Sequence, residues 1–195
     1  IKQLLTQLVP GLKVWLVVDD MRGKAGTSAT NTANFEFVID CAETMICILA
    51  GQFRDDGSSI SSYFLSGGCL KEIRRAVQTG TPIIFVHETT PMHHGVPLET
   101  HVRDCPADLK PMFEAAIKGG ELIPWHRARA FQDTTLRLIL AAMLRIEASR
   151  GQSKLRSSAE RGHTFRLDRL YVPTERTRQA RDHHSSCRWH AVSTS

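Results

Sequence analysis

Three short segments of the chain are continuously apolar, and they constrain the fold more than any other feature of the sequence. They are Lys13–Val18 (KVWLVV), Thr44–Ala50 (TMICILA) and Pro82–Val86 (PIIFV). A β-strand that is buried on both faces has apolar residues at nearly every position instead of at alternate positions. Segments with helical spacing of apolar residues lie between these runs. This alternation predicts an α/β fold with a parallel sheet and helices on both of its faces.

The remaining elements follow from helical periodicity and from turn residues. We expect a helix in each of five segments: Ile1–Val9, the segment beginning at Phe35, Cys69–Val77, Ala107–Lys118 and Phe131–Ala148. A short edge strand is expected over Glu121–Trp125, because Pro124 cannot donate a hydrogen bond within a central strand. Polar composition predicts loops in three further segments, Met21–Asn34, Gln52–Ser62 and His87–Pro106.

The excess of positive charge belongs to the last quarter of the chain. Residues 1–149 contain 15 Lys or Arg and 16 Asp or Glu, whereas residues 150–195 contain 10 and 4. The second segment also lacks apolar periodicity. We therefore predict one domain over residues 1–149, followed by a basic, disordered tail over residues 150–195. A net charge of −1 on the domain gives no basis for a specific nucleic-acid-binding face.

Cysteine usage and hydropathy bear on the compartment. The five cysteines are odd in number and form no CxxC motif; they are Cys41, Cys47, Cys69, Cys105 and Cys187. This pattern favours a reducing, cytoplasmic environment over a disulfide framework. The longest apolar run is far shorter than the roughly 20 residues needed to cross a bilayer, so no membrane span is expected.

Polar residues follow each of the three apolar runs. These are Asp19–Asp20, Gly51–Gln52 and His87–Glu88, and ligands of open parallel sheets bind beyond the carboxyl ends of the strands. No metal is expected there. Asp19 and Asp20 lack the phosphoacceptor Asp that a response regulator needs, since Ala50-Gly51 occupies that place. The other candidate ligands match no structural zinc spacing; they are His87, His93, His94, His101 and Cys105.

Taken in order, these segments resemble a Toll/interleukin receptor (TIR) domain from its second strand onwards, over roughly residues 1–148. The segments that carry the resemblance are KVWLVVDDM, FEFVIDCAE, TMICILAG, SYFLSGGCLKEIRRAV, PIIFVHE and IPWHRARAF. The resemblance implies a flavodoxin-like fold whose central first strand should precede Ile1 and is missing. We therefore expect an exposed apolar strand edge at Lys13–Val18, and poor solubility as a consequence.

The resemblance also implies an activity, the cleavage of the nicotinamide–ribose bond of NAD. The catalytic glutamate of the family lies in a motif like S-x-x-(W)-C-x-x-E, which Ser66, Cys69 and Glu72 match, with Gly68 in place of the aromatic residue. Glu72 is thus the expected catalytic residue. The expected substrate-binding residues are Ser66 and Cys69 on the same segment and three residues at the start of the first polar loop, Asp20, Arg22 and Gly23.

A single carboxylate suits this chemistry. Cleavage builds positive charge on the ribose, and a nearby carboxylate can stabilise that oxocarbenium-like state or form a covalent adduct. Nicotinamide leaves as a neutral group, so no strong general acid is required. NAD is then the substrate, and no cofactor is expected.

Two other functions remain open. The chain can be a non-catalytic TIR adaptor that signals by binding other TIR domains through the same polar loop, or an unrelated flavodoxin-like binding domain. Self-association is implied for both the enzyme and the adaptor. Simpler roles also remain for two site residues, since Ser66 can cap a helix and Cys69 can pack in the core.

Overall fold

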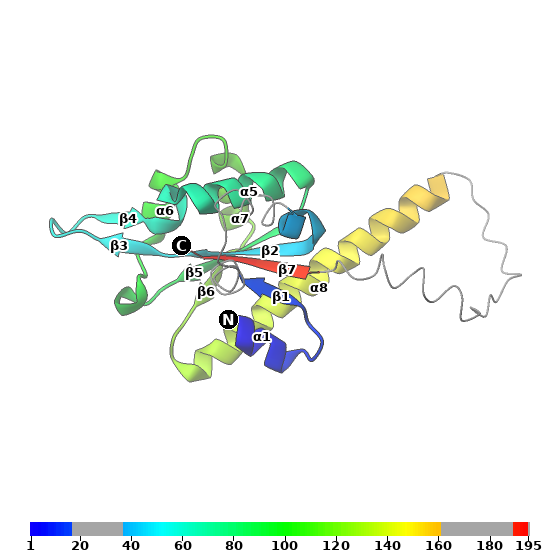
Figure 1. Ribbon diagram of the computed structural model, residues 1–195, viewed down its shortest axis with the longest axis horizontal. Coiled ribbons are helices and arrows are strands. Elements are labelled where there is room, and N and C mark those ends of the chain that lie inside the picture. The colour runs from blue at the N-terminus through cyan, green and yellow to red at the C-terminus, as the bar shows by residue number, and fades with distance from the viewer. Residues whose placement is uncertain (17–36, 161–188, 195) are drawn as a thin grey trace, which may run out of the picture.

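A five-stranded parallel sheet with strand order β1-β7-β2-β5-β6 forms the centre of the computed structural model, which describes residues 1–16, 37–160 and 189–194 (Figure 1). Its strands are β1 (Val14–Leu16), β7 (Trp189–Thr194), β2 (Ala42–Leu49), β5 (Ile83–Glu88) and β6 (Ile123–Trp125). The predicted α/β class, with a parallel sheet flanked by helices, is confirmed. The sheet is compatible with a flavodoxin-like fold, although the last strand along the chain, β7, occupies the place that the first strand has in the flavodoxin-like order.

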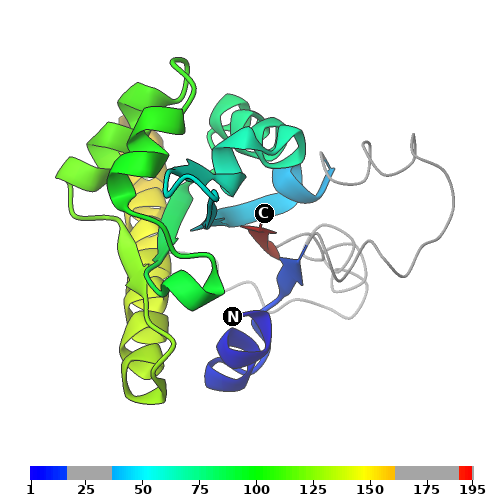
Figure 2. The same cartoon turned by 90° about the vertical axis from the view of Figure 1, so that its left-hand side faces the viewer.

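Helices cover both faces of this sheet (Figures 1 and 2). On one face lie α4 (Ser62–Leu65), α5 (Gly67–Thr79), α6 (Leu98–Asp104) and α7 (Lys110–Lys118). On the other lie α1 (Lys2–Leu8) and α8 (Arg129–Glu160). A short 3-10 turn, η1 (Pro91–His93), follows β5. Within the described part of the chain, no helix combines the length and the apolar character needed to cross a bilayer.

The alternation of side chains along β2 explains why its sequence is continuously apolar. Met45, Cys47 and Leu49 belong to a core cluster shared with α5 and α7, which includes Ile73 of α5. Ile46 belongs to a second cluster on the opposite face. Because successive side chains of a strand point to opposite faces, a strand between two helical layers needs apolar residues at every position. This packing is the physical reason for the continuous apolar run from which the sequence predicted a buried strand.

The second cluster lies between the sheet and the helices α1 and α8. Its fully buried members include Leu5 of α1, together with Leu136 and Ile139 of α8. Strand β5 supplies Ile84 and Val86 to this cluster and Phe85 to the other, which repeats the alternation of β2.

The central strand β7 is the main difference from the predicted organisation. It lies within the segment expected to be a disordered tail, yet it pairs in parallel with both β1 and β2. In flavodoxin-like sheets the first strand occupies this central position. The edge of β1 that was expected to be exposed by a missing central strand is instead covered by β7, because Val14–Leu16 are paired with residues 190–192. That prediction is therefore wrong.

Three element boundaries also differ from expectation. Helix α8 continues to Glu160 and so crosses the predicted domain boundary at residue 149. Helix α6 lies inside the predicted loop over residues 87–106. The predicted loop over residues 52–62 contains an antiparallel hairpin of β3 (Gly51–Phe53) and β4 (Ser59–Ser61). Helix α6 and the two strands of the hairpin are too short for hydrophobic periodicity to reveal them.

Gly51 joins β2 to the hairpin at a place where no side chain fits. A Cβ atom added there would approach the carbonyl oxygen of Ile60 and both methyl carbons of Val96 to less than 3 Å. The Gly51 amide also donates a hydrogen bond to the carbonyl of His94 (2.7 Å). The end of β2 is therefore held against β4 and the segment after η1 by backbone contacts.

We expect Gly51→Ala to lower the free energy of unfolding by roughly 1–3 kcal/mol, because backbone at Ile60 must move to admit the methyl group. Urea unfolding followed by circular dichroism measures the change. Gly67→Ala is the matched control, since a Cβ atom added at Gly67 meets nothing within 4 Å and Ala favours the helix. Equal stability of Gly51→Ala and the unmodified chain would contradict the close approach.

Candidate active site

Helix α5 carries the three described residues of the expected site, and its two ends are defined by specific groups. The Ser66 side chain caps the amino end by accepting a hydrogen bond from the Cys69 amide (3.4 Å). Gly80 ends the helix with a positive φ of 68°, where its amide donates to helix carbonyls. The capping role considered for Ser66 is confirmed. Its contact with a substrate stays a prediction.

Glu72 lies on the face of α5 that packs towards the sheet. Its side chain is buried, with 7% exposure, between the buried positions Cys69, Ile73 and Ala76 of the same helix. A carboxylate rarely lies in such surroundings without a specific partner or function, because its charged form loses hydration. Helix α5 also lies against β7, so Glu72 belongs to the part of the helix layer that covers the centre of the sheet.

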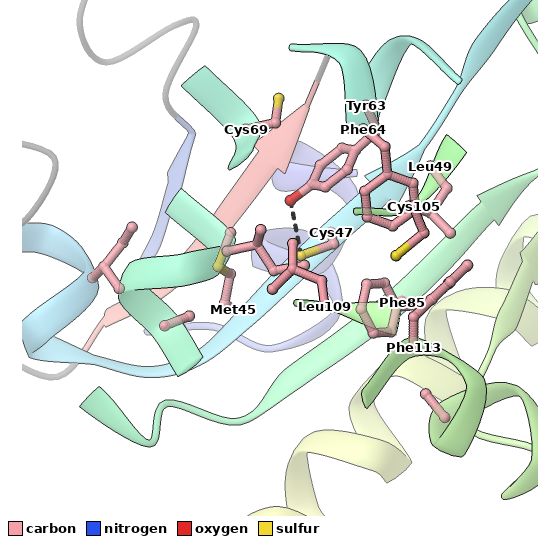
Figure 3. Close-up of a cluster of buried hydrophobic side chains, with 14 residues drawn as sticks. Met45, Cys47, Leu49, Tyr63, Phe64, Cys69, Phe85, Cys105, Leu109 and Phe113 are labelled. Carbon is pink, nitrogen blue, oxygen red and sulfur yellow. Dashed lines mark hydrogen bonds between the residues drawn. The ribbon is translucent and has the colours of Figure 1, made fainter. Parts of the chain in front are cut away.

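Cys47 of β2 and Tyr63 of α4 belong to the buried cluster that lies between α5 and the sheet (Figure 3). The Tyr63 hydroxyl donates a hydrogen bond to the Cys47 Sγ (3.0 Å), and both residues are fully buried. Burial raises the pKa of the Cys47 thiol well above its ordinary value, and the negative charge of Glu72 raises it further. Cys47 is therefore a neutral thiol at physiological pH and does not serve as a nucleophile. Cys69 packs in the same cluster, as its simpler interpretation proposed.

Two bidentate ion pairs fix α5 from its outer side. Arg74 binds Asp108 (2.7 and 3.1 Å), in the segment between α6 and α7, and Arg75 binds Asp40 (2.7 and 2.6 Å), in the helical turn before β2. The guanidinium groups lower the pKa of both carboxyls. Exposed pairs of this kind contribute about 1 kcal/mol or less, so they orient the helix more than they stabilise it.

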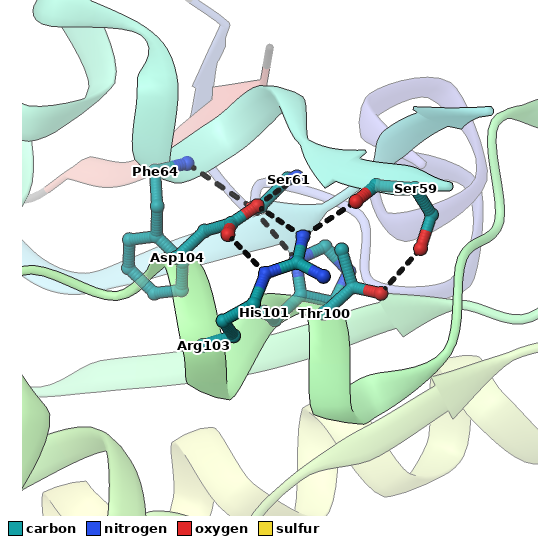
Figure 4. Close-up of polar contacts among 7 residues, drawn as sticks. All are labelled: Ser59, Ser61, Phe64, Thr100, His101, Arg103 and Asp104. Carbon is teal, nitrogen blue, oxygen red and sulfur yellow. Dashed lines mark hydrogen bonds and ion pairs between the residues drawn. The ribbon is translucent and has the colours of Figure 1, made fainter. Parts of the chain in front are cut away.

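Ser61, His101 and Asp104 meet at the base of the hairpin and superficially resemble a hydrolase triad (Figure 4). Ser61 Oγ lies 2.7 Å from His101 Nδ1, but it also caps α4 by accepting from the Phe64 amide (3.3 Å). Asp104 accepts from the Ser61 amide (2.8 Å) instead of orienting the histidine ring. Both Ser61 and His101 have 0% exposure. This arrangement therefore joins β4, α4 and α6 and has no surface from which a substrate can reach the serine.

Burial has a clear effect on His101. Together with repulsion from the neighbouring His87 ring, whose centroid lies 5.3 Å away, burial lowers the pKa of the imidazole to about 4. His87 itself is tied to the carbonyl of Val96 (2.8 Å). Among the described residues, no group of three or more His, Cys, Asp or Glu side chains is arranged to hold a metal ion.

A second buried carboxylate, Glu88, ends strand β5. It is 2% exposed, and one of its oxygens, Oε2, accepts from the Arg127 guanidinium (2.8 Å), while Oε1 accepts from the Thr90 amide (3.0 Å). Arg127 follows β6, so this ion pair joins the ends of two neighbouring strands. The burial of Glu88 is therefore explained by this ion pair, although the sequence analysis placed the residue at the carboxyl edge of the sheet, where ligands bind.

The expected site is thus only partly described. Cys69 and Glu72 lie on α5 and Ser66 caps its amino end, whereas Asp20, Arg22 and Gly23 lie outside the described residues. Sequence reasoning missed the neighbours contributed by Cys47 and Tyr63. The alternation of β2 could have placed Cys47 on the α5 side, but nothing in the sequence predicted the short helix that brings Tyr63 over it.

Comparisons with protein-family models, with curated proteins and with solved structures gave no match.

Protonation of His101 predicts a defined pH dependence of stability. The pKa of about 4 in the folded state lies below the ordinary value of 6.5, so the unfolded chain binds a proton first as the pH falls. The contribution of His101 to the free energy of unfolding should be constant above pH 6.5. It should fall between pH 6.5 and pH 4, by up to about 3 kcal/mol. Urea midpoints measured across this range test the prediction.

His101→Asn is the informative variant, because its amide can keep the contact with Ser61 while removing the titration. The dependence between pH 6.5 and 4 should become flatter, whatever the change in absolute stability. His93→Asn, at an exposed position of η1, should retain the original slope. An identical slope in His101→Asn and the unmodified chain would exclude His101 as its source.

Proposed function

We propose that this chain is a TIR-type signalling protein that hydrolyses NAD to nicotinamide and an ADP-ribose product, with Glu72 as the catalytic carboxylate. The observation that carries the proposal is the burial of Glu72 on the inner face of α5. This is the position that the resemblance assigns to the catalytic glutamate. At 7% exposure beside an apolar cluster, a negative charge acts strongly on a bound group, which suits the stabilisation of a cationic transition state.

The surroundings of Glu72 suit this role. Cys47 and Tyr63 are fully buried and carry no charge, so neither of them offsets the negative charge of the carboxylate. A charge interaction in such a poorly hydrated place is stronger than it is in water. As the bond from C1′ of the ribose to the nicotinamide nitrogen breaks, its electron pair leaves with neutral nicotinamide. Water then adds to C1′ and releases a proton.

The low exposure of Glu72 also has a consequence for catalysis. The ribose can reach the carboxyl group only if elements around the amino half of α5 move aside. The two ion pairs of Arg74 and Arg75 orient the helix itself, so the movement is expected in its neighbours. The implied self-association with other TIR domains, in the cytoplasm, fits such an activation step, because one subunit can rearrange the site of the next.

A non-catalytic adaptor is the second candidate, and Gly68 favours it. Gly68 is exposed in the first turn of α5, where TIR enzymes of plants often have a tryptophan. It offers no aromatic surface on which a nucleotide base or nicotinamide ring can stack. An adaptor would bind other TIR domains without turnover of NAD, and Glu72 would then be a structural residue.

The decisive experiment incubates the full chain with NAD at high protein concentration and follows nicotinamide release by chromatography. We expect release by the unmodified chain and a loss of about 100-fold or more in Glu72→Gln, which keeps the shape of the side chain and removes its charge. Glu147→Gln, at an exposed position of α8, is the matched control and should retain full activity. Gly68→Trp should increase the rate if stacking limits the reaction.

Two outcomes would contradict the proposal in different ways. If the unmodified chain and Gly68→Trp release no nicotinamide while the chain still associates with TIR domains, the adaptor is the correct function. If release is unchanged in Glu72→Gln, the activity stands and the assignment of Glu72 is wrong. Thermal melts of each variant separate loss of activity from loss of the fold.

A further inference from the structure

Strand β7 holds together two parts of the sheet that have no other strand pairing between them. Its residues pair with Val14–Leu16 of β1 on one side and with six positions of β2 on the other. In the described sheet, β1 is bonded to β7 alone, at the end of the strand order. Without β7, the slot between β1 and β2 would expose unpaired backbone groups along both strands, which is a strong template for another strand.

The covalent tether does not restrict β7 to the slot of its own chain. Residues 161–188 separate it from the end of α8, and the last turns of this helix project away from the sheet (Figure 1). A segment of this length spans roughly 90 Å when extended, at about 3.3 Å per residue. That reach is several times the width of a sheet of this size, so β7 can reach the slot of a neighbouring chain as well as its own.

The sequence of β7 suits insertion into a slot of this kind. The segment Trp189–Thr194 (WHAVST) has no proline, no glycine and no Asp, Glu, Lys or Arg. Every one of its amides can therefore donate to a neighbouring strand, and the strand carries none of the four residue types with a formal charge. The flanking segment is strongly basic by contrast, so the uncharged character is confined to the strand.

We propose that the slot between β1 and β2 is a strand-acceptor site that a second copy of this chain fills with its own residues 189–194. The product is a strand-exchanged dimer, in which each domain is completed by the central strand of the other. All native pairings of β7 are kept in the exchanged form, so the exchange changes which chain supplies them and not their number.

The exchange also reaches the candidate site. Ser193 is in register with Cys47, whose pKa is raised mainly by burial and also by the charge of Glu72, and α5 lies against β7. In the exchanged dimer the partner chain would therefore supply the strand beneath the helix that carries Glu72. This link to catalysis rests on the proposed function, whereas the exchange itself does not.

The register provides a direct test, because Ser193→Cys is paired with the native Cys47. The variant is made in the full chain with alanine at the four other cysteines. It is refolded from urea in a thiol–disulfide redox buffer, so that Cys47 can react before folding buries its thiol. We expect a disulfide-linked dimer on a non-reducing denaturing gel, increasing with the protein concentration at which the chain is refolded. His190→Cys is the control, since its register partners Val14 and Thr44 are not cysteines, and it should give no specific cross-link.

Each other outcome overturns the proposal. Cross-linking confined to single chains at every concentration would show that β7 fills only its own slot. No cross-link of either kind would show that β7 is not paired with β2. Sedimentation analysis of the unmodified chain provides a second measurement that is independent of the cysteine replacements, and a monomer at all concentrations would also exclude the exchange. Nicotinamide release is measured separately, so failure of either proposal can be recognised by itself.

Discussion

The parallel pairing of β7 with both β1 and β2 is the interaction on which the rest of this structure depends. Strand β2 lies between two helical layers and is bonded along both edges, by β7 on one side and β5 on the other. The helix α5, which carries Glu72, packs on the face of β2 and also lies against β7. The position of the candidate site is therefore set by a strand that comes from the opposite end of the chain.

Parallel strands need long connections, and a central strand supplied from a distant segment makes the pairing highly non-local. The entropy of ordering the connection must be overcome before the ladder contributes, so such pairings form late in folding. In a folding intermediate of this kind, residues 1–160 would be folded while the slot between β1 and β2 is still open. This order of events explains why the same slot that completes the fold can also receive a strand from another chain.

The sequence predicted the layers of the fold better than its topology. Continuous apolar runs identified β2 and β5, because burial on both faces removes the usual alternation. Strand β7 could not be found in this way. Its six residues contain little aliphatic character and stand beside a basic, low-periodicity segment, so their local composition indicates disorder. Pairing with two apolar strands overrides that local signal, and this context is not visible along the sequence.

The site was predictable to the extent that it lies on one helix. Helical spacing places Ser66, Cys69 and Glu72 together whatever the rest of the chain does. Tyr63, in contrast, reaches Cys47 only through a four-residue helix that no periodicity could reveal.

The two buried carboxylates show what burial alone can establish. Glu88 and Glu72 are both nearly inaccessible. Glu88 ends β5, receives Arg127 and the Thr90 amide, and joins two strand ends, so its burial is explained by the architecture. Glu72 lies instead on a helix beside the neutral, fully buried Cys47, and its charge makes that thiol harder to ionise. Under the proposed function, the same negative charge would stabilise the positive charge that builds on the ribose as the bond to nicotinamide breaks.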